Sequence, residues 1–184
     1  GDMALVLTEA MDTGDPYLRT YALDVLAENL ADASLLRLML LNRLPKVRRA
    51  AMEAVASRPQ KGLGKEALAY IMARSENEPA VIAAGLRAVR ATLGAWPGGV
   101  PDNLRTHEAL EVQAEALMLA LVGGEDGSRP AVDDALGRWS TAIDPKERRA
   151  AALLLYELAA ADLLGERRNL VDALLADPDQ NVRL

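Results

Sequence analysis

One stretch of the sequence recurs along its whole length, and this recurrence constrains the fold more than any other feature. The stretch is Leu44–Val55, with the sequence LPKVRRAAMEAV. Aligned on Val47, the same pattern returns at Leu18, Val81, Val112, Glu147 and Val182. The anchors are spaced by 29 to 35 residues, a period that is typical of proteins built from stacked repeats.

The copies agree on one face of a helix. Four residues after each anchor stands a small residue: Ala22, Ala51, Gly85, Ala116 and Ala151. Eight residues after it stands an apolar one: Leu26, Val55, Val89, Ala120 and Leu155. Offsets of four and eight place side chains on the same helical face, so this stripe is expected to be buried. A small residue within it lets a second helix approach closely, which predicts a helix crossing point.

The copies also carry a signal for a helix start. A proline precedes the anchor in most copies (Pro16, Pro45, Pro79, Pro145 and Pro178), usually after an acidic residue (Asp15, Glu78, Asp144 and Asp177). An aspartate side chain accepts hydrogen bonds from the free N–H groups of a first helical turn, and proline at the first position loses no hydrogen bond. The pattern therefore predicts capped helix starts.

This order of residues resembles the second helix of a HEAT repeat, a relative of the armadillo class. The clearest matches are Asp15–Arg19, Pro45–Arg48 and Asp144–Arg148, whereas Ile82 and Gln113 stand where arginine is usual. The resemblance covers nearly the whole chain. It implies an all-α fold, a right-handed α-solenoid (superhelix) of about five stacked helical hairpins, in a single domain over residues 1–184. It also implies that the second helices line a concave binding face.

The apolar periodicity predicts roughly ten helices. They cover residues 2–12, 16–30, 32 or 34 to 41, 46–57, a segment around Leu68 and Ile71, 79–93, 103–122, 131–140, 144–164 and 166–176. The segment 94–102 holds three glycines and two prolines, so we expect it to be the longest irregular stretch. A single long helix, residues 103–122, is expected to follow it.

The composition fits a helical core. Hydrophobic residues make up 51% of the 184 residues but aromatic ones only 3%, which suits closely packed helices better than a β-sandwich. The absence of cysteine excludes disulfides, thiolate metal sites and a cysteine nucleophile. No membrane span or signal peptide is visible, so we expect a cytoplasmic protein without a membrane partner. Both ends of the sequence look cut, so we also expect it to be part of a longer protein.

The charge is unevenly spread. The net charge is -6, yet ten basic residues stand between residues 43 and 90 against four glutamates. The basic residues are Arg43, Lys46, Arg48, Arg49, Arg58, Lys61, Lys65, Arg74, Arg87 and Arg90. This basic middle could attract an acidic peptide or a phosphate backbone. The alternative, which we favour, is that these are solvated helix faces and contacts between repeats.

Candidate chemical groups have structural alternatives. Arg19, Arg48, Arg148 and Arg183 recur at one repeat position, where a guanidinium could bridge to the aspartate or the carbonyls of an adjacent loop. We favour this structural role over ligand binding. His107 and Glu111 share a helical face, but two ligands do not make a zinc site. We therefore predict no catalytic residue, no metal site and no cofactor.

The candidate binding surface consists of residues on the second helices and in the irregular segment: Tyr17, Tyr21, Arg49, Glu53, Arg87, Arg90 and Trp96. Tyrosine, tryptophan and arginine are frequent energetic centres of protein interfaces. For Trp96 an alternative is open, in which its ring plugs the gap left by the irregular segment. We favour the plug.

Three functional hypotheses follow. The first is a non-catalytic helical-repeat scaffold that binds a protein or peptide partner on its concave face. The second is a nucleic-acid-binding HEAT-like protein that uses the basic region 43–90, which the acidic total charge disfavours. The third, and lowest, is an enzyme similar to the HEAT-like bilin lyases. No chromophore site is visible in support of it.

Overall fold

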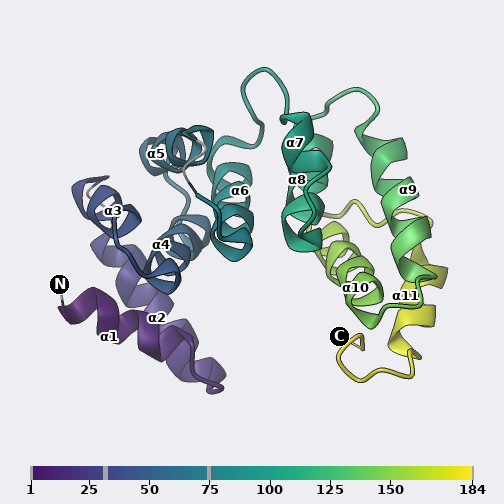
Figure 1. The fold of residues 1–184 in the computed structure, drawn as a ribbon, viewed down its shortest axis with the longest axis horizontal. Helices are drawn as coiled ribbons and strands as arrows, with labels where there is room; N and C mark the ends of the chain where they lie inside the picture. Colours follow the sequence, from purple (N-terminus) through teal and green to yellow (C-terminus); the bar gives the residue numbers. More distant parts are fainter. Residues whose placement is uncertain (1, 31–32, 74–75, 184) are drawn as a thin grey trace. The chain divides into compact units, whose positions relative to one another are not determined.

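The computed structural model describes residues 2–30, 33–73 and 76–183, and within these ranges all regular structure is helical (Figure 1). The helices are α1 (Asp2–Met11), α2 (Pro16–Asn29), α3 (Ala33–Leu40), α4 (Pro45–Ser57), α5 (Lys61–Met72), α6 (Pro79–Leu93), α7 (Asp102–Arg105), α8 (Leu110–Val122), α9 (Ser128–Ser140), α10 (Pro145–Ala160) and α11 (Arg168–Leu175). The all-α class is confirmed, and the right-handed superhelix stays a prediction. The helix start expected at Asp32 and the basic residue Arg74 lie outside the described residues.

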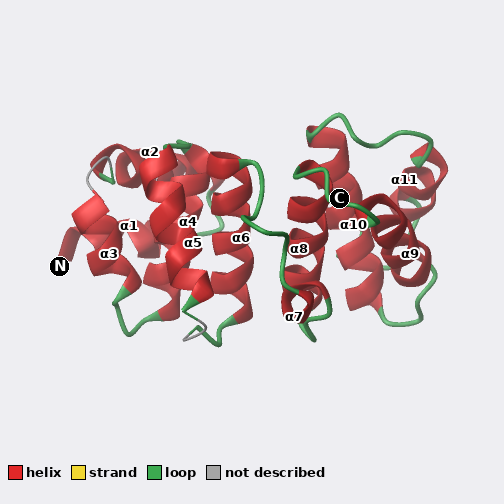
Figure 2. Cartoon of the chain, turned by 90° about the horizontal axis from the view of Figure 1, so that it is seen from above, coloured by secondary structure: helices red, strands yellow, loops and turns green. Residues whose placement is uncertain are grey.

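The chain divides into two compact units, Gly1–Gly98 and Gly99–Leu184. In the first unit α2, α4 and α6 pack in succession in one layer (Figure 1, Figure 2). In the other layer α3 packs on α5; α3 also contacts α4, and α5 contacts α4 and α6. The remaining helix, α1, packs against α2 and α4. Each helix of this unit therefore packs against its neighbours.

The second unit uses the same kind of packing. In it α8 packs on α10, α7 packs on α8, and α9 contacts both α8 and α10. The last helix, α11, packs on α10. The core of the second unit includes Leu136, Trp139, Leu154 and Leu158, all of them buried. The single repeat domain over residues 1–184 stays a prediction, because the two units are each compact by themselves.

Aspartates cap two helices as predicted. The Asp15 carboxylate accepts the N–H of Tyr17 at 2.9 Å at the start of α2. Likewise, the Asp144 carboxylate accepts the N–H of Lys146 at 2.8 Å at the start of α10. In both helices proline occupies the first turn. Sequence signals therefore define these two helix starts.

Of the other two predicted caps, the one at Glu78 is wrong. Glu78 stands at the capping position of α6, but its longer side chain makes no capping hydrogen bond. Asp177 makes the predicted bond: its carboxylate accepts the N–H of Asp179 at 2.9 Å and also pairs with Arg148, although the residues that follow form turns. Asp179 accepts the N–H of Asn181 at 2.8 Å in the same way.

The small residue in the repeated stripe does mark a helix crossing. A Cβ atom placed on Gly85 of α6 would lie 2.6 Å from the Cδ1 atom of Ile71 in α5. It would also lie 3.6 Å from the Cε atom of Met52 in α4. At Gly64 of α5, an added Cβ would lie 2.6 Å from the Cβ of Thr92 in α6. Two glycines therefore allow α5 and α6 to approach each other closely.

The expected long helix over residues 103–122 is wrong. The structure instead has a short α7 and a separate α8, with His107 in the turn between them. Its ring Nδ1 accepts the N–H of Ala109 at 3.0 Å, just before α8 begins. A side chain that binds a nearby backbone group in this way competes with helix continuation. The fourth copy is thus a hairpin like the others, with a shortened first helix.

A clamp holds the end of the irregular segment 94–102. Arg105 donates from Nε to the carbonyl of Val100 at 3.0 Å, and its guanidinium pairs with Glu125. Glu125 also accepts the N–H of Val100 at 2.8 Å. At the other end of the segment, Gly94 follows α6 with φ of 76°, a left-handed conformation that glycine adopts without strain. None of the helices in the described ranges has both the length and the apolarity that crossing a membrane requires.

Candidate interaction surfaces

The predicted surface begins on α2, where Tyr17 and Tyr21 stand one helical turn apart. Tyr17 is 86% exposed and Tyr21 is 67% exposed. Large aromatic side chains with this exposure provide wide apolar contact area and a hydroxyl group for a partner. These two residues are therefore placed as an interface would require.

Arg49 and Glu53 lie instead in a network of ion pairs across α2 and α4. Arg49 pairs with Asp12 and lies 3.5 Å from Glu53 in its own helix. Glu53 also lies 3.7 Å from Arg19 of α2. Their charges already stabilise one another, so a partner would meet a polar surface with little net charge. We call Tyr17, Tyr21, Arg19, Arg49 and Glu53 the α2–α4 surface.

The other residues predicted for the binding surface do not belong to the α2–α4 surface. Arg87 and Arg90 lie half-buried on α6, and both have interactions within the protein. Trp96 follows α6 and is only 6% exposed. Its ring is not presented to a partner, which favours the plug interpretation over an exposed anchor.

Two of the repeated arginines, Arg48 and Arg148, make the structural contacts that we favoured from the sequence, whereas Arg19 forms only an exposed ion pair. Arg48 donates to the carbonyls of Asn42 at 2.8 Å and Arg43 at 3.0 Å, and forms two hydrogen bonds with Glu76 at 2.7 and 2.9 Å. Tyr70 donates to the same carboxylate at 2.5 Å. A forked guanidinium that binds a carboxylate through two bonds is both strong and directional. The clamp ties α4 to the loop that precedes α6.

Arg148 repeats this geometry in the second unit. It donates to the carbonyls of Ala142 at 2.9 Å and Ile143 at 2.7 Å, and binds both carboxylate oxygens of Asp177 at 2.7 and 3.1 Å. Arg183 makes a reduced version, donating to the carbonyl of Asp177 at 3.1 Å. The same repeat position therefore performs the same structural task in α4 and α10.

The clamps hold their carboxylates in the charged form. Burial alone would raise the pKa of Glu76, but hydrogen bonds from Arg48, Tyr70 and the N–H of Glu78 outweigh it and lower this pKa to about 2. Burial and the bond to Glu76 raise the pKa of Tyr70 to about 12. The hydrogen bond from Arg148 lowers the pKa of Asp177. Glu76 and Asp177 thus stabilise the fold in their charged form.

Glu76 is expected to make stability depend on pH. Its pKa is lower in the folded chain than the ordinary value of 4.5, so its contribution is complete above about pH 4.5. The contribution is lost as the pH falls from 4.5 towards 2, because the unfolded state then binds a proton more readily. Urea unfolding followed by circular dichroism should show the midpoint falling across this window.

Two substitutions distinguish the contribution of Glu76 to this pH dependence from that of the other carboxylates. Glu76→Gln removes the titrating group and should flatten the fall of the midpoint below about pH 4.5. Glu28→Gln is the control, because its ion pair with Arg58 is 60% and 46% exposed. It should keep the slope of the unmodified chain. An equal slope in Glu76→Gln and the unmodified chain would contradict this assignment.

No metal chemistry is visible in the described part of the chain, where no three His, Asp or Glu side chains gather in a way that could hold an ion. The Nδ1 atom of His107 is occupied by the N–H of Ala109. This ring nitrogen therefore has its hydrogen-bond partner within the protein.

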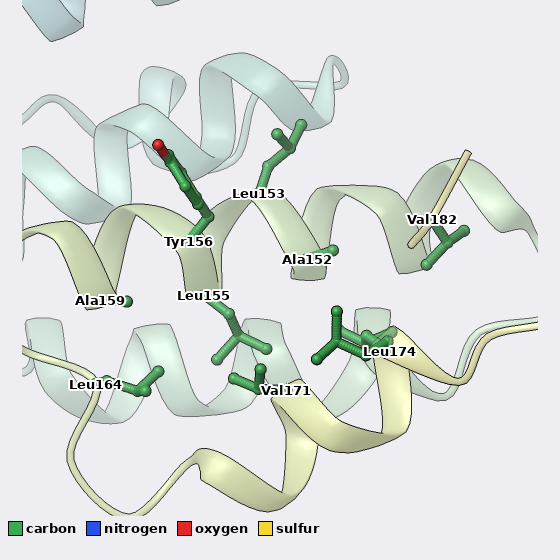
Figure 3. A pocket seen from close by; sticks show the side chains of 10 residues that line it. Ala152, Leu153, Leu155, Tyr156, Ala159, Leu164, Val171, Leu174 and Val182 are labelled. Atoms are coloured by element: carbon green, nitrogen blue, oxygen red, sulfur yellow. The ribbon is translucent and has the colours of Figure 1, made fainter. Parts of the chain in front are cut away.

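The second unit has an apolar groove of about 520 Å³ between α10, α11 and Val182. Ten residues line it, nine of which are alanine, leucine or valine and the tenth Tyr156. Figure 3 shows Leu155 of α10 facing Val171 and Leu174 of α11. Leu155, Leu174 and Val182 are buried, whereas Tyr156 is 64% exposed at the rim. We call this site the α10–α11 groove.

Our sequence analysis missed this groove, although a signal for it was present. The run Ala150–Leu155 is apolar at six consecutive positions, so α10 is apolar on more than the face that its own unit covers. A helix that is apolar all round is normally buried on all sides. In this unit one of those sides remains open.

Comparison with family models, with curated proteins and with solved structures finds no match for this chain. The resemblance to HEAT repeats therefore rests on the internal repeats, and it stays a prediction.

Proposed function

We propose that this chain is a non-catalytic helical-repeat scaffold that binds a protein or peptide partner through its second helices. The observation that carries the proposal is the exposure of Tyr17 and Tyr21 on one second helix. They lie on the same helix as Arg19, whose ion pair with Glu53 supplies polar groups. Exposed aromatic side chains are typical anchors of protein interfaces. A concave arrangement of the second helices and a cytoplasmic location are part of the same proposal.

The ion pairs argue against the nucleic-acid alternative. In the basic region 43–90, four side chains pair with carboxylates: Lys46 with Glu9, Arg48 with Glu76, Arg49 with Asp12, and Arg58 with Glu28. A phosphate backbone would have to displace these carboxylates. Binding of duplex DNA at low salt that weakens steeply as salt rises would favour the alternative instead.

The test is a selection of peptide ligands, followed by substitution of the tyrosines. Peptides selected from a random display library on the immobilised full chain should lose affinity for the Tyr17→Ala, Tyr21→Ala double variant. We expect a loss of about thirtyfold or more, because two interface tyrosines each contribute on the order of 1–2 kcal/mol. Fluorescence anisotropy of the labelled peptides measures it.

The matched control is Ile143→Ala, which removes an apolar side chain that is 97% exposed in the other unit. It should leave the affinity unchanged. If the selected peptides bound the double tyrosine variant as well as the unmodified chain, the α2–α4 surface would not be the binding site.

A further inference from the structure

The segment 177–183, at the edge of the α10–α11 groove, repeats the contacts of the loop that leads into α6. In the first unit the Glu76 carboxylate binds the repeated arginine of α4 and accepts the N–H of Glu78 at 3.0 Å. In the second unit the Asp177 carboxylate binds the repeated arginine of α10 and accepts the N–H of Asp179 at 2.9 Å. Asp177 therefore takes the place of Glu76.

The next bonds of this segment are those of a helix start. The N–H groups of Val182 and Arg183 donate to the carbonyl of Asp179 at 3.0 and 3.4 Å. The same two bonds, at the same repeat positions, begin α4, α6, α8 and α10. At the anchor position of the repeat Val182 is fully buried, as are Val81 and Val112. The segment therefore has the bonds and the burial with which the second helices of this chain begin.

Arg183 is held in the same way as the repeated arginines of complete helices. It donates to the carbonyl of Asp177, six residues before it, at 3.1 Å. Arg48 and Arg148 make the same bond to the carbonyls six residues before them, at 2.8 and 2.9 Å. Three arginines at one repeat position thus share one contact, and two of them belong to second helices that the structure shows in full.

The groove lies where a helix that starts in this way would continue. In the first unit α6 packs on both α4 and α5, and α5 precedes the loop of Glu76. In the second unit α10 and α11 form the walls of the groove, and α11 precedes Asp177. Val182 itself lines the groove. The groove therefore has the walls and the entry point that α6 has in the first unit.

We propose that the α10–α11 groove is an intramolecular site, occupied by the second helix of a further repeat that begins at Asp179 and continues past residue 184 of the same chain. The groove lining is apolar apart from the hydroxyl of Tyr156. It matches the buried stripe of the second helices, which stacking of one repeat on the next covers. The groove belongs to the second unit and the α2–α4 surface to the first, so the failure of either proposal leaves the other standing.

The test lengthens the full chain with a sequence of its own. Val182 and Arg183 stand at the repeat positions of Val47 and Arg48. A copy of the α4 residues that follow, 49–57, is therefore attached after Arg183 in place of the last residue. In α4 these residues form a helix that packs along α2. The attached copy should likewise be helical and should cover the groove.

NMR of the extended chain, labelled at its Ala, Leu and Val methyl groups, measures the contact. The signals of Leu155, Leu174 and Val182 should shift from their positions in the original chain. The control carries Met52→Glu and Val55→Glu in the attached copy only, at two positions that are fully buried in α4. Glutamate keeps the helix propensity but not the apolar face. Amide protons of the unmodified copy should exchange at least about tenfold more slowly than those of the control.

A change on the side of the groove tests the same contact without altering the attached copy. Leu175 of α11 lines the groove and is 51% exposed, so Leu175→Asp should leave the fold intact. In the extended chain it should speed the amide exchange of the attached copy about tenfold. Unchanged exchange in this variant would place the attached copy outside the groove.

Three further results would overturn the proposal. The first is equal amide exchange in the attached copy and in its glutamate control. The second is an extension that leaves the methyl signals of the groove where they were. The third is a shift of the Leu174 and Val182 signals on dilution of the original chain, which would show that a second copy covers the groove.

Discussion

Replacing Arg48 with alanine is expected to destabilise the first unit by about 3 kcal/mol, because it leaves the charge of Glu76 buried without its main partner. The Glu76 side chain is only 4% exposed and Arg48 13% exposed. Two loop carbonyls, those of Asn42 and Arg43, lose their donor as well. Urea unfolding at neutral pH should show this as a lower midpoint.

The control stands at the same repeat position. Arg19 corresponds to Arg48, but it is 55% exposed and lies 3.7 Å from Glu53. Arg19→Ala should therefore cost less than about 1 kcal/mol, as is usual for exposed ion pairs. If both substitutions cost the same, the clamp would not be what stabilises this unit. A loss of peptide binding by Arg48→Ala with stability unchanged would assign this arginine to an interface instead.

The local features of this fold could be predicted from the sequence. The stripe containing Ala51 and Gly85 is buried as expected, because a helical face is defined by residues a few positions apart. The capping by Asp15 and Asp144 is confirmed for the same reason, since cap and helix are neighbours in the chain. The arginine clamp could be expected in kind but not in its partner, because Glu76 lies 28 residues from Arg48.

The break before α8 shows that helix propensity was given too much importance relative to the spacing of the repeats. Residues 103–122 contain no glycine or proline, so local propensity favours one continuous helix. The repeat phase nevertheless places a helix start three residues before Val112, at Ala109, and the structure has its helix cap there. His107 accepts the N–H of this cap residue, Ala109. Repeat phase was the better guide than propensity.

The α2–α4 surface could be predicted from the sequence more fully than the α10–α11 groove. Tyr17 and Tyr21 are exposed at the start of a second helix, where the repeat pattern places them. The groove is formed by α10, α11 and Val182 together, so it depends on how these elements pack. Such pairings between helices are tertiary information that a local pattern does not contain.

A single added methyl group at Gly64 is expected to destabilise the first unit by about 2 kcal/mol, because α5 and α6 cross there without room for a side chain. The new Cβ would overlap the hydroxyl of Thr92 and lie 2.6 Å from its Cβ. Thr92 cannot turn away without cost, since its hydroxyl donates to the carbonyl of Ala88 at 2.6 Å. Thermal unfolding of Gly64→Ala, followed by circular dichroism, measures the effect.

Gly62→Ala in the same helix separates packing from helix propensity. No atom lies within 4 Å of a Cβ placed on Gly62, so this change should stabilise the unit by about 0.5 kcal/mol through lower entropy of the unfolded chain. The two alanines are two residues apart in α5 and differ mainly in what they touch. If the two variants change the stability in opposite directions, the crossing at Gly64 is a packing constraint. If Gly64→Ala stabilises the unit, α5 and α6 are farther apart than the structure has them.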